Sequence, residues 1–143
     1  MLHSELEIAK ILEETNRFGA DKSIIGLKAA IAILGKWGAS SKQMCAILCI
    51  TPSIHASAQK QTQNEWTINF DEDVIQRISL VLNIHSLLRQ IFDNPKNVYG
   101  FASMKNDNGF FNGRAPLDVM VQGDLASLYE TLKHVEALHA ISQ

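Results

Sequence analysis

The sequence is poor in several features that define common classes of protein. It has only two cysteines, Cys45 and Cys49, which are four residues apart within an expected helix. This spacing is a poor framework for a disulfide, and reduced thiols in the core of a cytosolic protein are the favoured interpretation. The longest apolar run, from Ile24 to Leu34, is interrupted by Lys28 and is too short to span a bilayer. No charged and then apolar leader opens the chain, so we expect a cytoplasmic protein with no membrane partner.

The chain also lacks the motifs of the common enzyme and cofactor-binding classes. It has no glycine-rich phosphate loop and no nucleophile elbow. His134 and His139 are five residues apart, so they diverge by about 140° around a helix and do not pair as the zinc ligands of a metalloprotease. Cys45, Cys49 and His55 offer three ligands, whereas a structural zinc site normally closes with four. We therefore expect no catalytic activity, no cofactor and no metal.

Alternation of apolar and polar residues with a period of two, which marks a half-buried strand, is found nowhere in the chain. Apolar residues instead recur at helical spacing, with helix-capping residues between the apolar segments. The sequence therefore predicts an all-α fold, whose long central helix is expected to break near Asn83. The expected helices cover Leu2 to Phe18, Asp21 to Leu34, Ser40 or Ser41 to about Leu48, Pro52 to about Gln63, Asp71 to Phe92, Pro95 to Met104, a short helix from Pro116, and Asp124 nearly to the end.

Two helical domains are expected, over residues 1–66 and 67–143, and they differ in charge. Residues 21–66 carry five lysines against Asp21 and Glu65, which gives a net charge of +3. Residues 67–143 carry six basic and nine acidic groups, which gives −3. The whole chain has a formal net charge of −2, so it has no overall attraction for nucleic acid. Only the middle segment is net positive, and its attraction is modest.

A buried helix, a short turn and a polar helix follow one another between residues 40 and 63. Met44, Ile47 and Leu48 lie on the inner side of the first helix, and Pro52 can start the second. This order is the helix-turn-helix pattern of DNA-binding proteins. Two observations weigh against DNA binding. A surface helix of any small domain has a similar composition, and DNA-binding helices usually carry more lysine and arginine. The candidate DNA-binding residues are Lys42, Ser53, His55, Ala56, Gln59 and Lys60.

The last part of the chain alternates turn signals with helix signals. Asn112-Gly113 is a strong turn signal, because glycine adopts positive φ without steric cost. Pro116 suits the first turn of a helix, where its missing N–H is no loss. Gly123 then indicates a helix stop, and Asp124 the N-cap of the last helix. An apolar stripe on that helix is formed by Leu125, Leu128, Leu132 and Val135.

A contiguous stretch from Phe111 to Tyr129, together with an upstream segment, carries a family resemblance. The matching residues are Phe111–Leu117, Met120, Gly123–Tyr129, Arg77–Ile84 and Ile91–Phe92. They resemble the Xre/MbcA/ParS-type antitoxins of RES-domain toxin–antitoxin systems. Where the family usually has Trp followed by a Pro-Asn pair before the loop, this chain has Phe101 and Lys105-Asn106. The resemblance covers about the last half of the chain well and the first half more weakly.

The resemblance implies a function through occlusion. Toxins of this type consume NAD or transfer ADP-ribose from it. The C-terminal domain of the antitoxin binds the toxin and covers its NAD site, and the helix-turn-helix binds operator DNA and represses the operon. Arg114 is either an anchor at the partner interface or a loop arginine that holds a backbone carbonyl or Asp118. The resemblance implies toxin binding by Gly113, Arg114, Pro116, His139, Ala140, Ile141, Ser142 and Gln143.

Two other functions and one assembly state follow from the same residues. The chain could be a stand-alone DNA-binding transcriptional regulator without a toxin, or a protein-interaction scaffold that no longer binds DNA. The helices at residues 24–34 and 74–92 are apolar on more than one face. Because this is more apolar helical surface than one small core needs, we expect a homodimer that pairs through the second faces of these helices.

Overall fold

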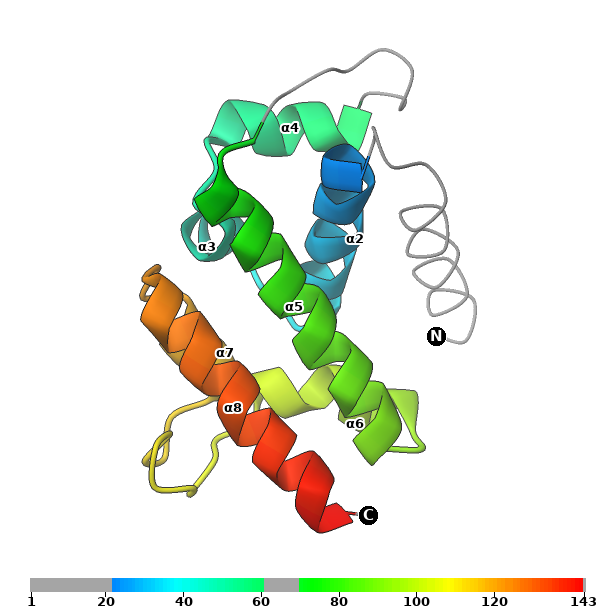
Figure 1. Ribbon diagram of the computed structural model, residues 1–143, viewed down its shortest axis with the longest axis vertical. Helices are drawn as coiled ribbons and strands as arrows, with labels where there is room; N and C mark the ends of the chain where they lie inside the picture. Colours follow the sequence, from blue (N-terminus) through cyan, green and yellow to red (C-terminus); the bar gives the residue numbers. More distant parts are fainter. Residues whose placement is uncertain (1–21, 61–69, 143) are drawn as a thin grey trace.

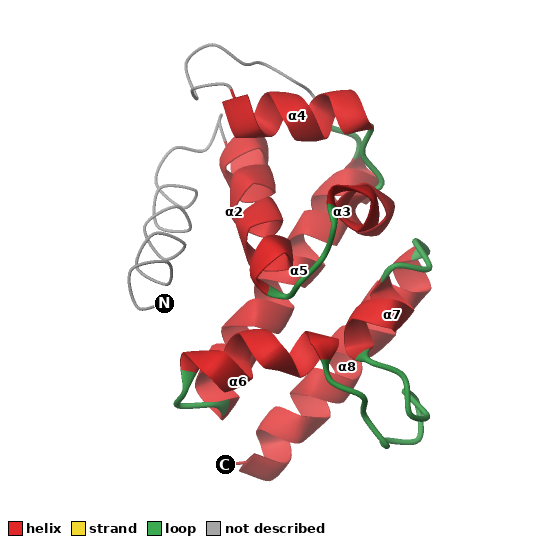
Figure 2. Cartoon of the chain, turned by 180° about the vertical axis from the view of Figure 1, so that it is seen from behind, coloured by secondary structure: helices red, strands yellow, loops and turns green. Residues whose placement is uncertain are grey.

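A computed structural model of the protein describes residues 22–60 and 70–142, and every regular element in these residues is a helix (Figures 1 and 2). The expected all-α fold is confirmed for this part of the chain. The predicted helix over residues 2–18, the predicted cap at Asp21, most of the linker at residues 64–70 and the candidate residue Gln143 lie outside the described residues.

The helices form two layers with a further helix across one end. In Figure 1, α5 and α8 lie in front of α2, α3, α6 and α7, and Figure 2 shows the same arrangement from behind. Helix α4 lies across the end of the molecule that α2 and α3 also reach. The described helices are α2 (Lys22–Lys36), α3 (Ser41–Leu48), α4 (Pro52–Lys60), α5 (Glu72–Ile91), α6 (Pro95–Gly100), the 3-10 helix η2 (Phe101–Ser103), α7 (Pro116–Met120) and α8 (Leu125–Ser142).

Side chains that cap the helices account for where several of them begin. Ser40 and Gln43 form a reciprocal capping box at the start of α3. Asp71, Thr51 and Asp124 each accept a hydrogen bond from the backbone N–H three residues later, at 3.0, 3.1 and 3.0 Å. These bonds satisfy backbone donors that have no partner inside the helix. The predicted starts of α3, α4, α5 and α8 are confirmed.

Helix α5 is continuous from Glu72 to Ile91, so the predicted break near Asn83 is wrong. Asn83 is exposed on the helix surface. One asparagine in a helix interior costs only a fraction of a kcal/mol, up to about 0.7 relative to alanine. Helix α5 packs against α2 on one side and against α8 on another, and this packing outweighs the local cost.

A single hydrophobic core runs through both parts of the described chain. Trp37, Leu48, Ile84, Leu88 and Leu128 belong to it, although they come from both sides of the predicted domain boundary at residues 66 and 67. Helix α5 is the element that joins them, because it contacts α2, α3, α6 and α8. The N-terminal and C-terminal helices are therefore packed into one unit.

Helix α2 uses its apolar surface inside the chain. Gly26 lets it approach α5 closely, because a Cβ at that position would lie 3.2 Å from the Cγ2 of Ile78. The large apolar side chains from Ile24 to Leu34 are all buried, so the predicted dimer contact through residues 24–34 is wrong. Within the two described ranges, no helix combines the length and the apolar composition needed to cross a bilayer.

The two cysteines are not core thiols, which corrects the expectation from the sequence. Cys49 is exposed and Cys45 is only partly buried. Helix α3 ends at Leu48, and Cys49 adopts a left-handed conformation with φ of 58°, so its side chain leaves the helix at the turn. Burial raises the pKa of the Cys45 thiol, which favours its neutral form.

A buried histidine lies where α5 meets α6. His85 is fully buried, its Nε2 lies 3.4 Å from the hydroxyl oxygen of Tyr99, and the two rings are stacked. Its Nδ1 has no hydrogen-bond partner. Burial, followed by the positive charge of Arg89, lowers the pKa of His85 to about 4. The ring is therefore neutral at physiological pH.

Candidate functional site

Helices α3 and α4 form the first candidate site. The turn between them consists of Cys49, Ile50 and Thr51, a length typical of a helix-turn-helix. In Figure 1, α3 is seen end-on while α4 lies across the view, so the two helices cross. Cys49 takes the left-handed conformation that glycine often supplies in such turns.

The outer face of α4 presents polar and small side chains. Ser53, Gln59 and Lys60 are exposed, and Ala56 is half-buried. Ser53, Ala56 and Lys60 are spaced by three and four residues, so they lie along one face of the helix. Lys42 is exposed on α3. Five of the six predicted DNA-binding residues are thus accessible to a partner.

His55 is the exception, and its prediction as a DNA-binding residue is wrong. Its side chain is 5% exposed, and its Nε2 lies 3.2 Å from the Sδ of Met44 on α3. Ala58, three residues later on the same face of α4, is also buried. This face packs α4 against the rest of the fold, so His55 cannot reach a base edge.

The segment from α2 to α4 carries charged residues of one sign. Between Lys22 and Lys60 the sequence contains five lysines and no aspartate or glutamate. Lys36, Lys42 and Lys60 have exposed side chains. Exposed lysines attract an anionic partner, and the attraction weakens as the salt concentration rises.

A second candidate site is the loop between η2 and α7. Arg114 donates from Nε to the carbonyl oxygen of Phe111 and from Nη2 to that of Phe110, both at 2.8 Å. The sequence predicted two roles for Arg114, and the structure shows the one in which the side chain bonds to backbone carbonyls of the loop. These carbonyls belong to Phe110 and Phe111. The Arg114 side chain nevertheless remains exposed, so it is available to a partner.

Backbone and ring contacts fasten this loop to α8. The N–H of Gly113 donates to the carbonyl oxygen of Asn106 at 2.8 Å, which joins the two ends of the loop. Asn112 and Gly113 both have positive φ, of 52° and 82°, so the predicted turn is confirmed. The ring of Phe110 stacks on His134 of α8, with centroids 4.5 Å apart. The loop therefore has a defined position on the surface.

Pro116 is buried, so its prediction as a toxin-contacting residue is wrong. It is the first residue of α7, as the sequence predicted, and Ala115 and Leu117 beside it are buried as well. Its role is to start α7, where its fixed φ suits the helix. Gly113 is half-buried and shapes the turn that precedes α7.

The described part of the predicted toxin-binding tail, residues 139–142, is the last turn of α8. The helix runs to Ser142, whose Oγ donates to the carbonyl oxygen of Leu138 at 2.9 Å. Ala140, Ile141 and Ser142 are exposed, with Ile141 82% exposed, and His139 is half-buried. The residues that the resemblance assigns to the partner therefore form a helix end that projects apolar surface.

Arg77 is a residue whose role sequence reasoning missed. It is 6% exposed and donates from Nη1 to the carbonyl oxygen of Ile47 at 3.2 Å and to that of Gly123 at 2.7 Å. Its Nε donates to Asp73 at 2.9 Å. Gly123 approaches α3 closely, because a Cβ there would lie 3.4 Å from the carbonyl oxygen of Ala46. Arg77 thus joins α3, α5 and the turn before α8.

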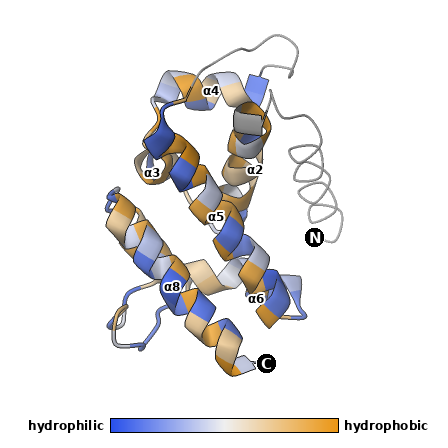
Figure 3. Cartoon of the chain, viewed as in Figure 1, coloured by the Kyte–Doolittle hydropathy of each residue, from blue (hydrophilic) through white to orange (hydrophobic). Residues whose placement is uncertain are grey.

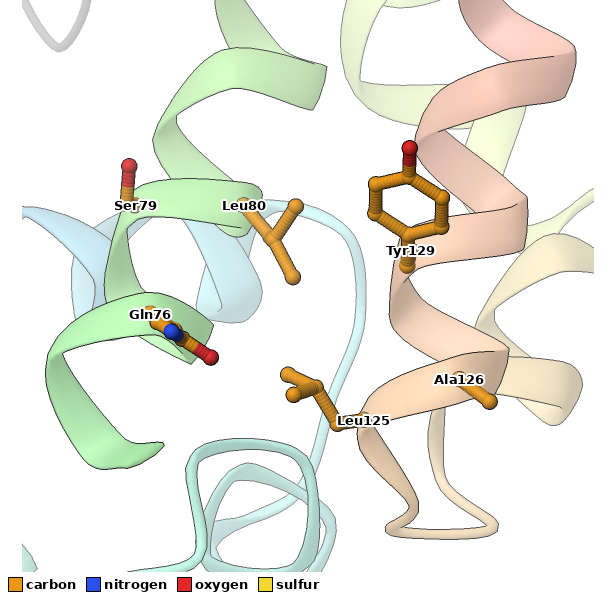
Figure 4. Close-up of a pocket in the computed structure, with 6 residues that line it drawn as sticks. All are labelled: Gln76, Ser79, Leu80, Leu125, Ala126 and Tyr129. Carbon is orange, nitrogen blue, oxygen red and sulfur yellow. The ribbon is translucent and has the colours of Figure 1, made fainter. Parts of the chain in front are cut away.

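A groove between α5 and α8 was also missed. It has a volume of about 540 Å³ and a mainly apolar lining (Figure 4). Figure 3 shows the start of α8, which borders the groove, in the colour of apolar residues. The next turns of the two helices line a more polar hollow of about 360 Å³, which includes Asn83 and Glu136. We call the first of these the α5–α8 groove, and it is lined by Gln76, Ser79, Leu80, Leu125, Ala126 and Tyr129.

Signals for both missed features were present in the sequence. Arg77 stands three residues after Val74 and four before Val81, so it falls on the buried face of α5. A charged residue on an apolar face indicates a buried partner. Tyr129 stands four residues after Leu125, outside the buried stripe, and it remains 48% exposed.

In residues 22–60 and 70–142, no three His, Cys, Asp or Glu side chains lie close enough together to hold a metal ion. Cys45, Cys49 and His55 are among the side chains that this covers.

Comparison with known proteins gives one distant relative. The chain is 25% identical over 114 residues, which are 78% of this chain and 81% of the relative, to the uncharacterised protein y4oB of Sinorhizobium fredii (strain NBRC 101917 / NGR234). No protein-family model and no solved structure matches the chain. The name of the relative states no activity.

Proposed function

We propose that the protein is an antitoxin of the Xre/MbcA/ParS type. Its C-terminal half binds a RES-domain toxin and occludes the toxin's NAD site, and helices α3 and α4 bind operator DNA and repress the operon. Inhibition by occlusion requires no catalytic group from this chain. It requires a stable surface that fits the entrance of the partner's site.

The observation that carries this proposal is the contact between the two segments that resemble the family. Arg77 is the first residue of the upstream matching segment, and Gly123 is the first residue of the matching stretch from Gly123 to Tyr129. The guanidinium of Arg77 donates to the carbonyl oxygen of Gly123 at 2.7 Å. Their helices, α5 and α8, form the most extensive helix pair in the described chain. Segments that matched separately in the sequence therefore belong to one structural unit.

The toxin-facing surface in this proposal has two parts. One is the exposed guanidinium of Arg114, held at a fixed place by its bonds to the loop carbonyls. The other is the exposed end of α8, where Ile141 projects apolar surface. Arginine is enriched among the residues that contribute most of the energy of a protein interface, and burial of an exposed apolar side chain is favourable.

The DNA-facing surface is the outer face of α4 with the lysines around it. The side-chain amide of Gln59 can donate one hydrogen bond to the edge of an adenine and accept one from it. Lys60 and Lys42 can neutralise phosphates. With few exposed cations, binding should depend on only a few phosphate contacts. The salt dependence of the affinity should accordingly be shallow.

The test begins with the gene beside the one that encodes this chain. If that gene encodes a RES-domain protein, it is expressed alone and together with this chain, and growth and cellular NAD are measured. We expect NAD to fall in the first culture and to stay normal in the second. NAD depletion that is unchanged by co-expression would refute the antitoxin proposal.

A stand-alone transcriptional regulator is the second candidate, and the one-signed charge of residues 22–60 favours it. Binding of the full chain to its own promoter, measured by mobility shift at two salt concentrations, separates the candidates. Promoter binding without a neighbouring toxin gene supports the regulator. Neutralisation of a toxin without promoter binding supports an antitoxin whose helix-turn-helix serves only as part of the scaffold.

A further inference from the structure

We propose that the α5–α8 groove is a binding site for a small, uncharged and mainly apolar molecule that carries one hydrogen-bonding group. An aromatic amide is a simple member of this class. The proposal goes beyond the proposed function, because neither occlusion of a toxin nor binding of operator DNA needs a small ligand. It rests on the size of the groove, on its apolar walls and on the lack of charge among the described residues that line it.

The groove has the dimensions of a ligand site. Its volume of about 540 Å³ lies within the range of roughly 300–1,000 Å³ that is usual for the binding sites of small molecules. The hollow beside Met104 has a smaller volume, about 290 Å³, and Lys105 is part of its lining. The α5–α8 groove therefore combines more room with a more uniform lining.

Apolar side chains from both helices border this space. Figure 4 shows Leu80 of α5 on one side of it and Leu125 and Tyr129 of α8 on the other. Leu80 and Leu125 are half-buried and Tyr129 is 48% exposed, so these side chains keep apolar surface that a ligand can cover. Burial of this surface is favourable, and a flat aromatic ligand can also pack against the ring of Tyr129.

The charge distribution selects an uncharged ligand. The described residues that line the groove include no lysine, arginine, aspartate or glutamate. On α5 the sequence has none of these residue types between Arg77 and Arg89, and the buried His85 is neutral. A carboxylate or an ammonium group between Leu80 and Leu125 would lose its hydration without gaining a counter-ion, which is unfavourable.

Lys133 is a cation at the edge of the groove. Its Nζ lies 5.7 Å from the centroid of the Tyr129 ring. Glu130 and Glu136 are exposed on the same helix, three residues before and three residues after Lys133, so they offset its charge. Lys133 is itself exposed, so its ammonium group stays in water. An anionic ligand in the groove therefore gains little from this lysine.

Gln76 supplies the polar contact to the ligand. It is exposed, and its side-chain amide can both donate and accept a hydrogen bond. Figure 4 shows this amide directed toward the side of the groove where Leu125 lies, whereas the hydroxyl of Ser79 points away from Leu125 in the same view. A ligand with one amide beside Gln76 and an apolar body beside Leu80 and Tyr129 matches this arrangement.

The short extent of the apolar surface favours a small ligand over a helix of a partner protein. A helix that binds in a groove presents apolar residues over two turns or more. Beyond the groove, the next turns of α5 and α8 border a more polar hollow, whose lining includes Asn83, Gln90 and Glu136. A small molecule needs only the apolar part.

The test is the binding of two matched naphthalene derivatives to the full chain. Naphthalene-1-carboxamide is uncharged and carries one amide, and naphthalene-1-carboxylate has the same rings and a negative charge. Each competes with N-phenyl-1-naphthylamine, an uncharged dye whose fluorescence rises in apolar surroundings. We expect saturable binding of the dye. The carboxamide should displace it at a concentration about tenfold or more lower than the carboxylate, because the groove offers the charge no partner.

Four variants locate the site. Tyr129→Glu and Ala126→Glu each place a charge in the wall and should weaken the binding of dye and carboxamide about tenfold or more. Gln76→Leu removes the polar contact, so it should weaken the carboxamide about threefold or more and leave the dye bound. Met104→Glu is the matched control, since Met104 is 62% exposed and lines a different hollow. Circular dichroism and a thermal melt establish that each variant folds, which we expect at these exposed positions.

Each outcome decides the proposal. Binding that prefers the carboxamide, is lost in the two wall variants and is kept in Met104→Glu supports it. A wild-type chain without saturable dye binding overturns it, as expected of a groove that only a macromolecule covers. Equal or tighter binding of the carboxylate also overturns it, and so does unchanged affinity in folded Tyr129→Glu and Ala126→Glu. None of these results bears on DNA binding or on toxin neutralisation.

Discussion

Replacing Arg77 by methionine should destabilise the protein strongly, because Arg77 connects three elements from a buried position. Methionine keeps an apolar stem of similar length, so the change removes mainly the guanidinium. The carbonyl oxygens of Ile47 and Gly123 each lose a donor, at 3.2 and 2.7 Å. Hydrogen bonds to charged groups contribute about 1.5–3 kcal/mol each, so the two together predict a loss on the order of 3–6 kcal/mol in the free energy of unfolding.

The ion pair with Asp73 should contribute much less than the carbonyl contacts. The Asp73 side chain is 42% exposed, so solvent screens the pair, and Asp73→Asn should cost less than about 1 kcal/mol. Arg77→Lys should fall between the two variants, because one ammonium group cannot reach two carbonyls on separate elements as a guanidinium does. Urea denaturation followed by circular dichroism measures all three variants.

The comparison of Arg77→Met with Asp73→Asn shows whether Arg77 acts through its ion pair or through its bonds to the two carbonyls. If both variants lose the same small amount of free energy, Arg77 acts as an ordinary surface ion pair, and the idea that it joins α3 to the α7–α8 turn is wrong. A large loss for Arg77→Met alone, with an unchanged denaturant slope, supports a role in holding the native packing.

Four further perturbations test separate parts of the structure. Leu128→Ala, at a side chain that is 1% exposed, should lower the free energy of unfolding by about 2–5 kcal/mol in urea denaturation, whereas Ile141→Ala at the exposed helix end should change it little. His85 has a pKa lowered to about 4, so the unfolded chain binds a proton more readily than the folded one. Stability should therefore fall as pH drops from about 6.5 toward 4, by about 1.5 kcal/mol between pH 6.5 and 5, and unfolding curves of His85→Leu should lack this part of the slope. Lys60→Glu should weaken binding to all DNA sequences and reduce the salt dependence in mobility-shift titrations, and unchanged affinity would show that α4 is not the DNA-binding helix. Removal of residues 139–143 should leave the melting temperature nearly unchanged yet weaken toxin neutralisation in a growth assay, and full protection by the truncated chain would exclude the helix end as the occluding element.

The helix starts could be predicted from the sequence because their causes are local. Ser40, Asp71 and Asp124 cap helices through bonds to residues three positions away. Pro116 and the Asn112-Gly113 turn likewise act through their own backbone dihedral angles. A reader of the sequence sees each of these causes within a window of four residues.

The features that sequence reasoning missed depend on contacts between distant residues. Arg77 bonds to carbonyls 30 and 46 residues away, and no local pattern indicates which carbonyls these are. His55 looked like an outward residue because α4 is polar, yet its ring packs against the thioether of Met44. The groove arises only where α5 and α8 meet, so its lining could not be listed before their packing was known.

If the chain has the proposed function, the continuity of the core restricts how the binding of a toxin and the binding of DNA can influence each other. A two-domain chain with a free linker could rotate one domain against the other when a partner binds. Here α5 packs against both α2 and α8, and Arg77 holds the carbonyl oxygens of Ile47 in α3 and of Gly123 before α8. A partner on α8 would therefore act on the same packed unit that carries α4. It would change operator binding by adding or blocking contacts with DNA, or by changing how many copies are held together, and not by swinging α3 and α4 away from the C-terminal helices.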